Sequence, residues 1–246
     1  MLSGRTLLPA FLLVFLALAP VWGGDWQSPD PDVSLGHFPT KLVDDLPHLF
    51  IPENIAPLAI GGLATSVDWA TLDGQNSLAS DLQNWKTQPL WNFGNFYGEG
   101  WVEGSAALGS WGIGALTDNL KVQEFGRDAA ESLVDATVTV TVLKYAVGRE
   151  RPDGSNNFSF PSGHTITAFC IVPAVFKYWG VQAGVETCAL GTLTALARVE
   201  GYHHYLSDTI AGATLGILIG NAVVYAPKDV KVTLGPGEIG LQLAFN

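Results

Sequence analysis

Residues 162–180 read SGHTITAFCIVPAVFKYWG, and residues 181–197 continue with VQAGVETCALGTLTALA. Both runs are apolar and lack strict alternation, and runs of this length favour helices over strands. Trp179 and Gly180 predict a turn between two antiparallel helices, and Pro173 predicts a kink in the first helix. Four further apolar segments surround this pair, so the sequence predicts an all-α bundle of about six core helices. The four segments are residues 54–67, 104–117, 131–147 and 208–226.

One of these segments contains an alternative. Residues 136–142 alternate and are β-branched, which by itself is typical of a strand. Their neighbours on both sides are helical in pattern, so we expect one helix through the whole segment. The aromatic stretch 91–97, together with Trp101, predicts packing around a glycine-rich loop. The alternative is a lip that contacts a membrane surface or an acyl chain.

The two ends differ from the bundle. Residues 1–24 predict a secretory signal peptide, with Arg5 before an apolar run at 7–18 and small residues after it. An uncleaved anchor helix is the alternative. Near the other end, residues 230–234 and 241–245 alternate around a Gly-Pro-Gly turn, which predicts a β-hairpin. The expected organisation is a signal peptide at 1–24, an extended arm at 25–50, a helical domain at 51–227 and a hairpin tail at 228–246.

Composition narrows the class of protein. Only 14% of the 246 residues are charged and 48% are hydrophobic, which excludes a disordered chain. The net charge of −11 excludes nucleic-acid binding through a basic surface. With the signal peptide, we expect an exported protein, periplasmic or associated with the cell envelope. Of the six apolar segments, only the last is free of charge over nearly a spanning length, at residues 209–227, so a peripheral bundle is favoured over packed, tilted membrane helices.

Export to an oxidising compartment raises the question of a disulfide. Cys170 and Cys188 lie nine residues on either side of Trp179, which would bring them level in two antiparallel helices. The sequence is compatible with a disulfide between them and with two buried free thiols.

Three short motifs carry the chemistry. In the first, Lys144 and Arg151 are seven residues apart, so they share a face if one helix runs to Pro152. Taken alone, this is also the pattern of a solvated basic helix end. Arg149 and Glu150 between them are expected to be solvated.

The second motif is Phe-Pro-Ser-Gly-His-Thr at 160–165, at the start of an apolar run. Proline and Ser162 are residues that begin helices, and Gly163 lets an anion approach the backbone closely. The free N–H groups of a helix start form a ready site for phosphate. His164 in the first turn is placed to donate a proton to a group held there. A plain N-cap with a surface histidine is the alternative.

In the third motif, His204 and Asp208 are four residues apart and would be neighbours on a helix. A carboxylate there would hold one imidazole N–H and leave the other nitrogen free as a nucleophile. Gly201 lets Arg198 fold back toward the same place. His203 is expected to face elsewhere, and a surface ion pair is the alternative for His204.

In this order the motifs resemble the three-part signature of the type 2 phosphatidic acid phosphatase superfamily. That superfamily includes lipid phosphatases, bacterial class A acid phosphatases and vanadium haloperoxidases. The resemblance implies that His204 is a nucleophile forming a phosphohistidine, that Asp208 orients it, and that His164 protonates the leaving alcohol. It further implies that phosphate is bound by Lys144, Arg151, Ser162, Gly163 and Arg198, without a metal. One departure is Ala197, where the family usually has serine.

The expected activity is therefore hydrolysis of phosphate monoesters, with a lipid or isoprenoid phosphate favoured by the apolar composition. A broad-specificity acid phosphatase for soluble esters and a vanadium-dependent haloperoxidase are the alternatives. No cofactor is expected, although vanadate would fit the phosphate site as an inhibitor or as a haloperoxidase cofactor. The expected partners are a phosphorylated lipid or small phosphate ester and a membrane surface. The acidic chain around a cationic pocket predicts better activity below neutral pH.

Overall fold

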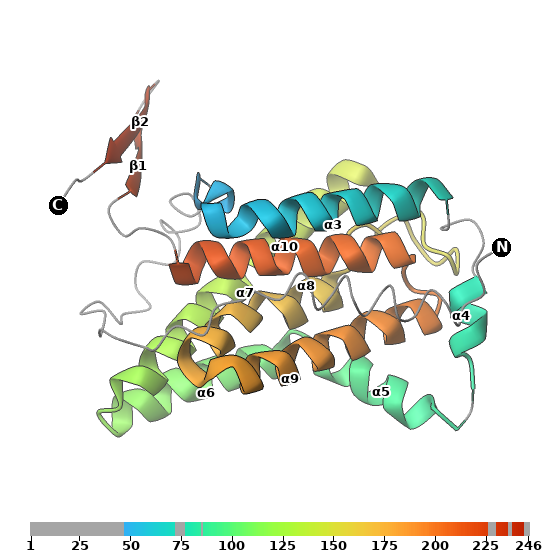
Figure 1. Cartoon of the computed structure of the whole chain (residues 1–246), viewed down its shortest axis with the longest axis horizontal. Coiled ribbons are helices and arrows are strands. Elements are labelled where there is room, and N and C mark those ends of the chain that lie inside the picture. Colours follow the sequence, from blue (N-terminus) through green and yellow to red (C-terminus); the bar gives the residue numbers. More distant parts are fainter. Residues whose placement is uncertain (1–46, 72–76, 85, 226–229, 236–237, 244–246) are drawn as a thin grey trace.

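The computed structural model describes residues 47–71, 77–84, 86–225, 230–235 and 238–243. The described residues up to Tyr225 form a bundle of α-helices, as the sequence predicts (Figure 1). In chain order the elements are η1 (Pro47–Phe50), α3 (Pro52–Thr71), α4 (Ser77–Leu82), α5 (Gln88–Tyr97), α6 (Trp101–Leu116), α7 (Leu120–Val147), α8 (Gly163–Cys170), α9 (Val172–Glu200) and α10 (Leu206–Tyr225).

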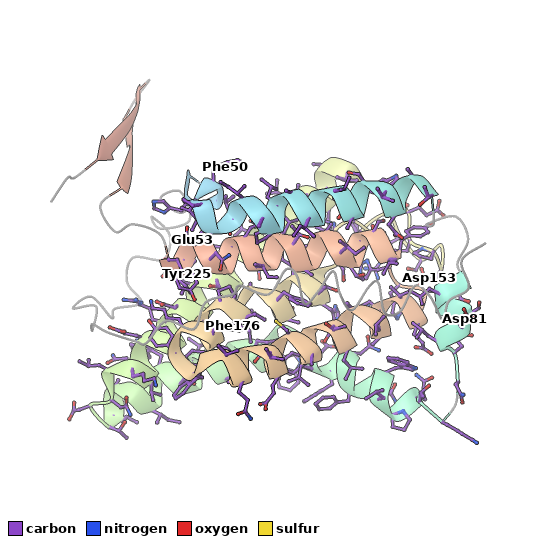
Figure 2. The ribbon with its side chains drawn as sticks, in the orientation of Figure 1. Phe50, Glu53, Asp81, Asp153, Phe176 and Tyr225 are labelled. Atoms are coloured by element: carbon purple, nitrogen blue, oxygen red, sulfur yellow. The ribbon has the colours of Figure 1, made fainter. Side chains whose placement is uncertain are left out.

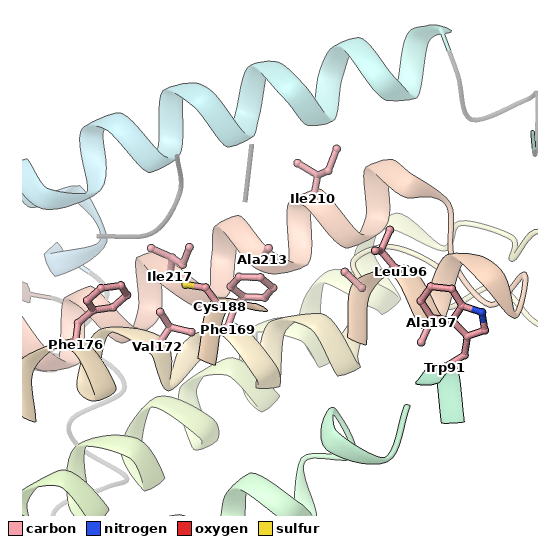
Figure 3. Close-up of a cluster of buried hydrophobic side chains, with 11 residues drawn as sticks. Trp91, Phe169, Val172, Phe176, Cys188, Leu196, Ala197, Ile210, Ala213 and Ile217 are labelled. Atoms are coloured by element: carbon pink, nitrogen blue, oxygen red, sulfur yellow. The ribbon is translucent and has the colours of Figure 1, made fainter. Parts of the chain in front are cut away.

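Helix α10 is the centre of the bundle. It contacts α3, α7, α8 and α9, and most of its residues are buried. Figure 3 shows part of this core, where Ala213 and Ile217 of α10 lie beside Phe169 of α8 and Val172 of α9. A helix buried on every side must be apolar all round, which accounts for the long uncharged run in the sequence.

A stripe of small residues brings the backbones of α8 and α10 together. Gly212, Gly216 and Gly220 lie four residues apart and so share one face of α10. A Cβ atom added at these glycines would lie 2.8 Å from the Ser162 carbonyl oxygen, 2.7 Å from that of Ile166, and within contact of that of Cys170. Since backbone cannot move aside as a flexible side chain can, the stripe fixes where α8 begins relative to α10.

We expect Gly216→Ala to lower the free energy of unfolding by about 1–3 kcal/mol, because its methyl group would overpack the α8 backbone. Gly109→Ala is the matched control, since a Cβ atom there meets nothing within 4 Å. That control should raise the free energy of unfolding by up to about 1 kcal/mol through helix propensity. Urea unfolding of both variants checks the pair. Equal effects at the two positions would contradict the packing described here.

The turn between antiparallel helices lies where the sequence predicts it. Gly180 has φ +85° and ψ −179°, so the helical path breaks there inside α9. Across this break Gly184 lies against Phe176 and Gly191 against Phe169. The expected kink near Pro173 is also present, as a bend of 51° between α8 and α9. Cys170 and Cys188 are both buried and free, so the disulfide alternative is wrong.

Two expectations about the helices need correction. Helix α7 runs through residues 136–142 as predicted, but it ends at Val147, because Gly148 adopts the left-handed conformation (φ +60°) and caps it. Arg151 therefore lies beyond the helix and shares no helical face with Lys144. The aromatic stretch 91–97 is helical and forms most of α5. In that helix Trp91 is buried, whereas Phe93 and Phe96 are exposed.

The expected hairpin is present as β1 (Val230–Gly235) and β2 (Glu238–Leu243), paired antiparallel with Val230 opposite Leu243. Its second strand begins at Glu238, earlier than the alternation suggests. The predicted signal peptide and all but the last residues of the predicted arm lie outside the described residues. The last four residues of that arm form η1, where His48 is buried.

Candidate active site

The three sequence motifs meet at one end of the bundle, where α7 and α9 end and α8 and α10 begin (Figure 1). Figure 2 shows Asp153, which follows the first motif, at this end and away from Glu53 and Tyr225. A backbone hydrogen bond connects two of the motifs. The Ser162 N–H donates to the Asp208 carbonyl (3.0 Å), which joins the second and third motifs.

Lys144 projects from the last turn of α7 toward the second motif. Its Nζ donates to the Phe158 carbonyl at 2.5 Å, and its Cε lies beside Gly163 at the start of α8. Burial, and then the positive charge of Arg151, lower the pKa of Lys144 to about 8. The positive charge of Arg151 thus acts on Lys144 although the two residues do not share a helix.

Arg151 is held by the loop that follows α7. Its Nε donates to Asn156 Oδ1 (2.9 Å) and its Nη1 to the His203 carbonyl (3.4 Å). His203 Nδ1 lies 3.2 Å from Asp153 Oδ2, and the His203 side chain is 40% exposed. His203 therefore ties the loop to the third motif, in keeping with the structural role expected for it.

Arg198 lies in the last turn of α9 and is buried. Its Nη1 donates to Asn95 Oδ1 of α5 at 2.9 Å. Its carbonyl accepts the N–H groups of His203 (3.1 Å) and His204 (3.2 Å). This one residue thus supplies a cation and anchors the backbone of the histidine pair.

His204 is bound differently from the expectation. It precedes α10, and its Nδ1 lies 2.6 Å from the Ser159 carbonyl, whereas Asp208 Oδ2 is 3.7 Å away, longer than a hydrogen bond. A carbonyl only accepts, so Nδ1 must carry the proton and Nε2 must carry the lone pair. Burial lowers the pKa of His204 to about 4, against the opposing effect of Asp208. The ring is therefore neutral at pH 7 in the tautomer that a nucleophile at Nε2 requires.

Asp208 organises the loop that holds His204. Its Oδ2 accepts the Ser159 hydroxyl at 2.5 Å and the Tyr205 N–H at 3.0 Å. The bond to Tyr205 resembles one half of a capping box, with the acid in the first turn of α10. Its Oδ1 accepts Nη1 of Arg149 at 2.6 Å. Asp208 is thus linked to His204 through Ser159 and not by the direct bond that the four-residue spacing suggested.

His164 lies in the first turn of α8, as predicted, and its Nε2 is 3.8 Å from Glu99 Oε1. Burial, and then Arg198, lower the pKa of His164 to about 3. Ser162 occupies the N-cap position, but its side chain makes no cap bond there; its Oγ accepts the Thr165 hydroxyl at 2.9 Å. The N–H groups at the start of α8 thus receive no bond from the Ser162 side chain.

Sequence reasoning missed three residues of this site. Arg149, expected to be solvated, is 12% exposed at its side chain and paired with Asp208. Ser159 lies between the first two motifs and belongs to neither, and Asn95 lies in the aromatic stretch that was expected to pack around a loop. The signal for Arg149 was Gly148, since a helix that ends there turns the next residue back toward the bundle. In the described part of the chain, no group of three or more His, Cys, Asp or Glu side chains is placed to hold a metal ion.

Comparison with known protein families matches residues 126–231 to the PAP2 superfamily, a segment that contains all eight predicted site residues. The match covers 106 of the 246 residues and shows that this segment is similar to the PAP2 superfamily. The resemblance drawn from the three motifs is thereby confirmed. The PAP2 segment begins inside α7 and runs past the end of α10, so it includes the central helix and both helices that pack around Gly180.

Several proteins are similar to the chain. A lipid A 1-phosphatase of Porphyromonas gingivalis is 37% identical over 84 residues, which is 33% of this chain and 19% of that protein. Phosphatidylglycerophosphatase B of Bacillus subtilis is 33% identical over 98 residues, which is 32% of this chain and 46% of that protein. A PA-phosphatase related-family protein of Dictyostelium discoideum is 29% identical over 144 residues, 46% of this chain and 53% of that protein. The chain thus spans at most about half of these relatives.

The fold is shared with a solved structure, described as the first transmembrane PAP2 type phosphatidylglycerolphosphate phosphatase from Bacillus subtilis. The match has a TM-score of 0.57 at 17% identity and covers 69% of this chain and 93% of that one. It shows that the two chains share their helical arrangement.

Proposed function

We propose that the chain is a phosphatase that hydrolyses phosphate monoesters through a phosphohistidine at His204. The observation that carries this proposal is the short bond from His204 Nδ1 to the Ser159 carbonyl, which leaves the Nε2 lone pair free. A module that only bound phosphate would need cations but no histidine held in one tautomer. The three arginine and lysine side chains nearby supply those cations as well.

The phosphate group would be held by charge. Lys144, Arg151 and Arg198 come from three different segments. Burial, and then the positive charge of Arg151, lower the pKa of both Lys144 and Arg198. Charge-assisted hydrogen bonds of this kind contribute about 1.5–3 kcal/mol each. The N–H groups at the start of α8, beside Ser162 and Gly163, add a further anion site. The proposed reaction draws its charge stabilisation from these groups and uses no metal.

The reaction would proceed in two steps. In the first, His204 Nε2 attacks phosphorus, the P–O bond to the alcohol breaks, and the alcohol leaves with a proton from His164. In the second, His164 takes a proton from water as the water oxygen attacks phosphorus, and the P–N bond breaks to release inorganic phosphate. The low pKa of His164 in the free protein would rise when phosphate neutralises Arg198, its main charged neighbour. Substrate would thus bring His164 into its acid form.

A lipid phosphate is the favoured substrate class. Pairs of aromatic rings lie around the site, each with at least one exposed ring, and such rings favour the membrane interface. The named relatives act on lipid A and on phosphatidylglycerophosphate, which supports the same class. The pairs are Trp69 with Phe160, Tyr145 with Phe158, and Phe96 with Trp101.

The helices also support association with a membrane. Val134, Val138, Val142 and Tyr145 form an exposed stripe on α7 at near four-residue spacing, and α3 exposes further apolar side chains. Among the described helices, α10 is long and apolar enough to cross a membrane, although 89% of its apolar window is buried inside the protein. We further propose export to the periplasm or envelope, on the strength of the signal pattern at residues 1–24.

Phosphate release from two substrates tests the proposed function. We expect release from phosphatidic acid in detergent micelles and from a small aryl phosphate, and vanadate should inhibit both by occupying the phosphate site. Release from the aryl ester alone would overturn the lipid assignment and leave a soluble-ester phosphatase. No release from either ester would overturn the phosphatase itself.

The pH profile should show the state of Lys144. Because its pKa is lowered to about 8, kcat/KM should fall above about pH 8 as the ammonium loses its charge and phosphate binding weakens. Lys144→Arg should move this fall to higher pH, since a guanidinium stays protonated. A wild-type profile that rises steadily to pH 9, or an identical fall in the arginine variant, would contradict the role given to Lys144.

A further inference from the structure

Arg149 is held on every side by groups of the site, although it was expected in solvent. Its Nη1 lies 2.6 Å from Asp208 Oδ1 and 2.8 Å from Ser207 Oγ. The guanidinium lies between two aromatic rings, with its central carbon 3.8 Å from the ring centre of Trp69 and 4.0 Å from that of Tyr205. Its Nη1 thus contacts the first turn of α10, and both faces of the guanidinium are covered by rings.

The backbone of Arg149 makes a second link to the same loop. Its carbonyl accepts the Ser159 N–H at 2.9 Å. The Ser159 hydroxyl is bound by Asp208, whose other oxygen is bound by the Arg149 side chain. The Ser159 N–H is therefore bound by the Arg149 carbonyl, and the Ser159 hydroxyl is bound by a carboxylate that the Arg149 side chain also binds. The Ser159 carbonyl, which dictates the tautomer of His204, is the remaining polar group of that residue.

We propose that Arg149 is a positioning residue that sets the tautomer and direction of the His204 ring by clamping Asp208 and Ser159. The inference rests on the proposed function, in which His204 Nε2 is the nucleophile. It separates Arg149 from Lys144, Arg151 and Arg198, which are assigned to the phosphate itself.

Arginine suits this position for physical reasons. Asp208 is fully buried, and a buried carboxylate without a cation would be driven toward its neutral form. A neutral carboxyl carries a proton and would compete to donate where it now accepts from Ser159 and Tyr205. A planar guanidinium satisfies the charge and also stacks between two rings, which a lysine ammonium cannot do. Trp69 belongs to α3, so the stack also connects that helix to the segments that contain Arg149 and Tyr205.

The test uses Arg149→Met and Arg149→Lys, with Arg151→Met as the contrasting variant. For Arg149→Met we expect kcat to fall on the order of 10²-fold, while KM and the vanadate inhibition constant change less than about 3-fold, because the phosphate cations remain. Arg149→Lys should recover part of kcat. Arg151→Met should instead raise KM and the vanadate constant. A parallel rise of the vanadate constant in Arg149→Met would overturn the proposal by making Arg149 a phosphate ligand.

Nitrogen NMR of the histidine rings provides a readout that does not depend on turnover. The wild-type His204 signal should report protonated Nδ1 and bare Nε2, and Arg149→Met should show a mixture of tautomers. An unchanged single tautomer with unchanged kcat would overturn the proposal. If the wild type releases no phosphate, the proposed function fails, but the ring signal still tests Arg149.

Trp69→Leu keeps the test decisive if Arg149→Met does not fold. Trp69 is 43% exposed and supplies one face of the stack. Its loss should lower kcat several-fold and broaden the His204 signal while the vanadate constant stays unchanged. Wild-type kcat and ring signals in both Trp69→Leu and Arg149→Lys would overturn the proposal.

Discussion

His204→Asn should lower phosphate release on the order of 10⁴-fold, because the reaction loses its nucleophile. Asparagine is chosen because its amide N–H can replace His204 Nδ1 as the donor to the Ser159 carbonyl, which keeps the loop intact. Release of inorganic phosphate from phosphatidic acid measures the effect, and circular dichroism checks the fold. Binding of vanadate should survive, since the cations of the site are unchanged.

The adjacent histidine is the matched control. His203 lies next to His204 but is 40% exposed and faces Asp153 in the loop. His203→Asn should therefore retain turnover within about an order of magnitude, because a partly exposed pair of this kind contributes little. Equal losses of turnover in the two variants would mean that both histidines support the fold and that neither ring is the nucleophile.

His164→Gln should have an effect that depends on the leaving group. With a lipid phosphate, whose alcohol needs a proton to leave, turnover should fall on the order of 10²–10⁴-fold, the usual contribution of a general acid. With an aryl phosphate whose phenol is strongly acidic, the first step should be nearly unchanged, because that phenolate leaves without a proton. Rapid-mixing measurement of the first burst of phenol checks this difference.

Glu99→Gln is the companion variant, since Glu99 is the carboxylate 3.8 Å from His164 Nε2. Glu99 is 48% exposed, so its removal should change turnover far less than the loss of His164 itself. If His164→Gln slowed both esters equally in the first step, His164 would be a ligand of phosphate rather than the acid.

Much of the fold was visible in the sequence because burial leaves a strong pattern. Helix α10 is surrounded by other helices, so its sequence is apolar all round and its limits are predicted closely. The turn at Gly180 was also predictable, since a glycine between two apolar runs marks a break. The three motifs could be placed at one site because their residue types and order match a known family.

The errors arose where a local contact overrides a spacing rule. Lys144 and Arg151 share a face only if α7 reaches Pro152, but the left-handed Gly148 ends the helix first. His204 and Asp208 have helical spacing, yet His204 precedes the helix and bonds to Ser159. Every residue carries a backbone carbonyl, so the sequence does not show which carbonyl will accept a bond from a histidine. Arg149 was read as solvated because the two rings that cover it come from segments 80 and 56 residues away.

The most direct test of the account is to trap phosphate on His204. His164→Gln is mixed with an aryl phosphate, quenched in alkaline detergent within the first turnover, digested and examined by mass spectrometry. Because the first step proceeds without His164 and the second lacks its base, a phosphate should accumulate on the peptide that contains His204. This phosphate should be stable to alkali and lost in acid. It should be absent from the double variant that carries both His164→Gln and His204→Asn. Phenol release without any phosphate on that peptide would contradict the central claim that His204 is the nucleophile.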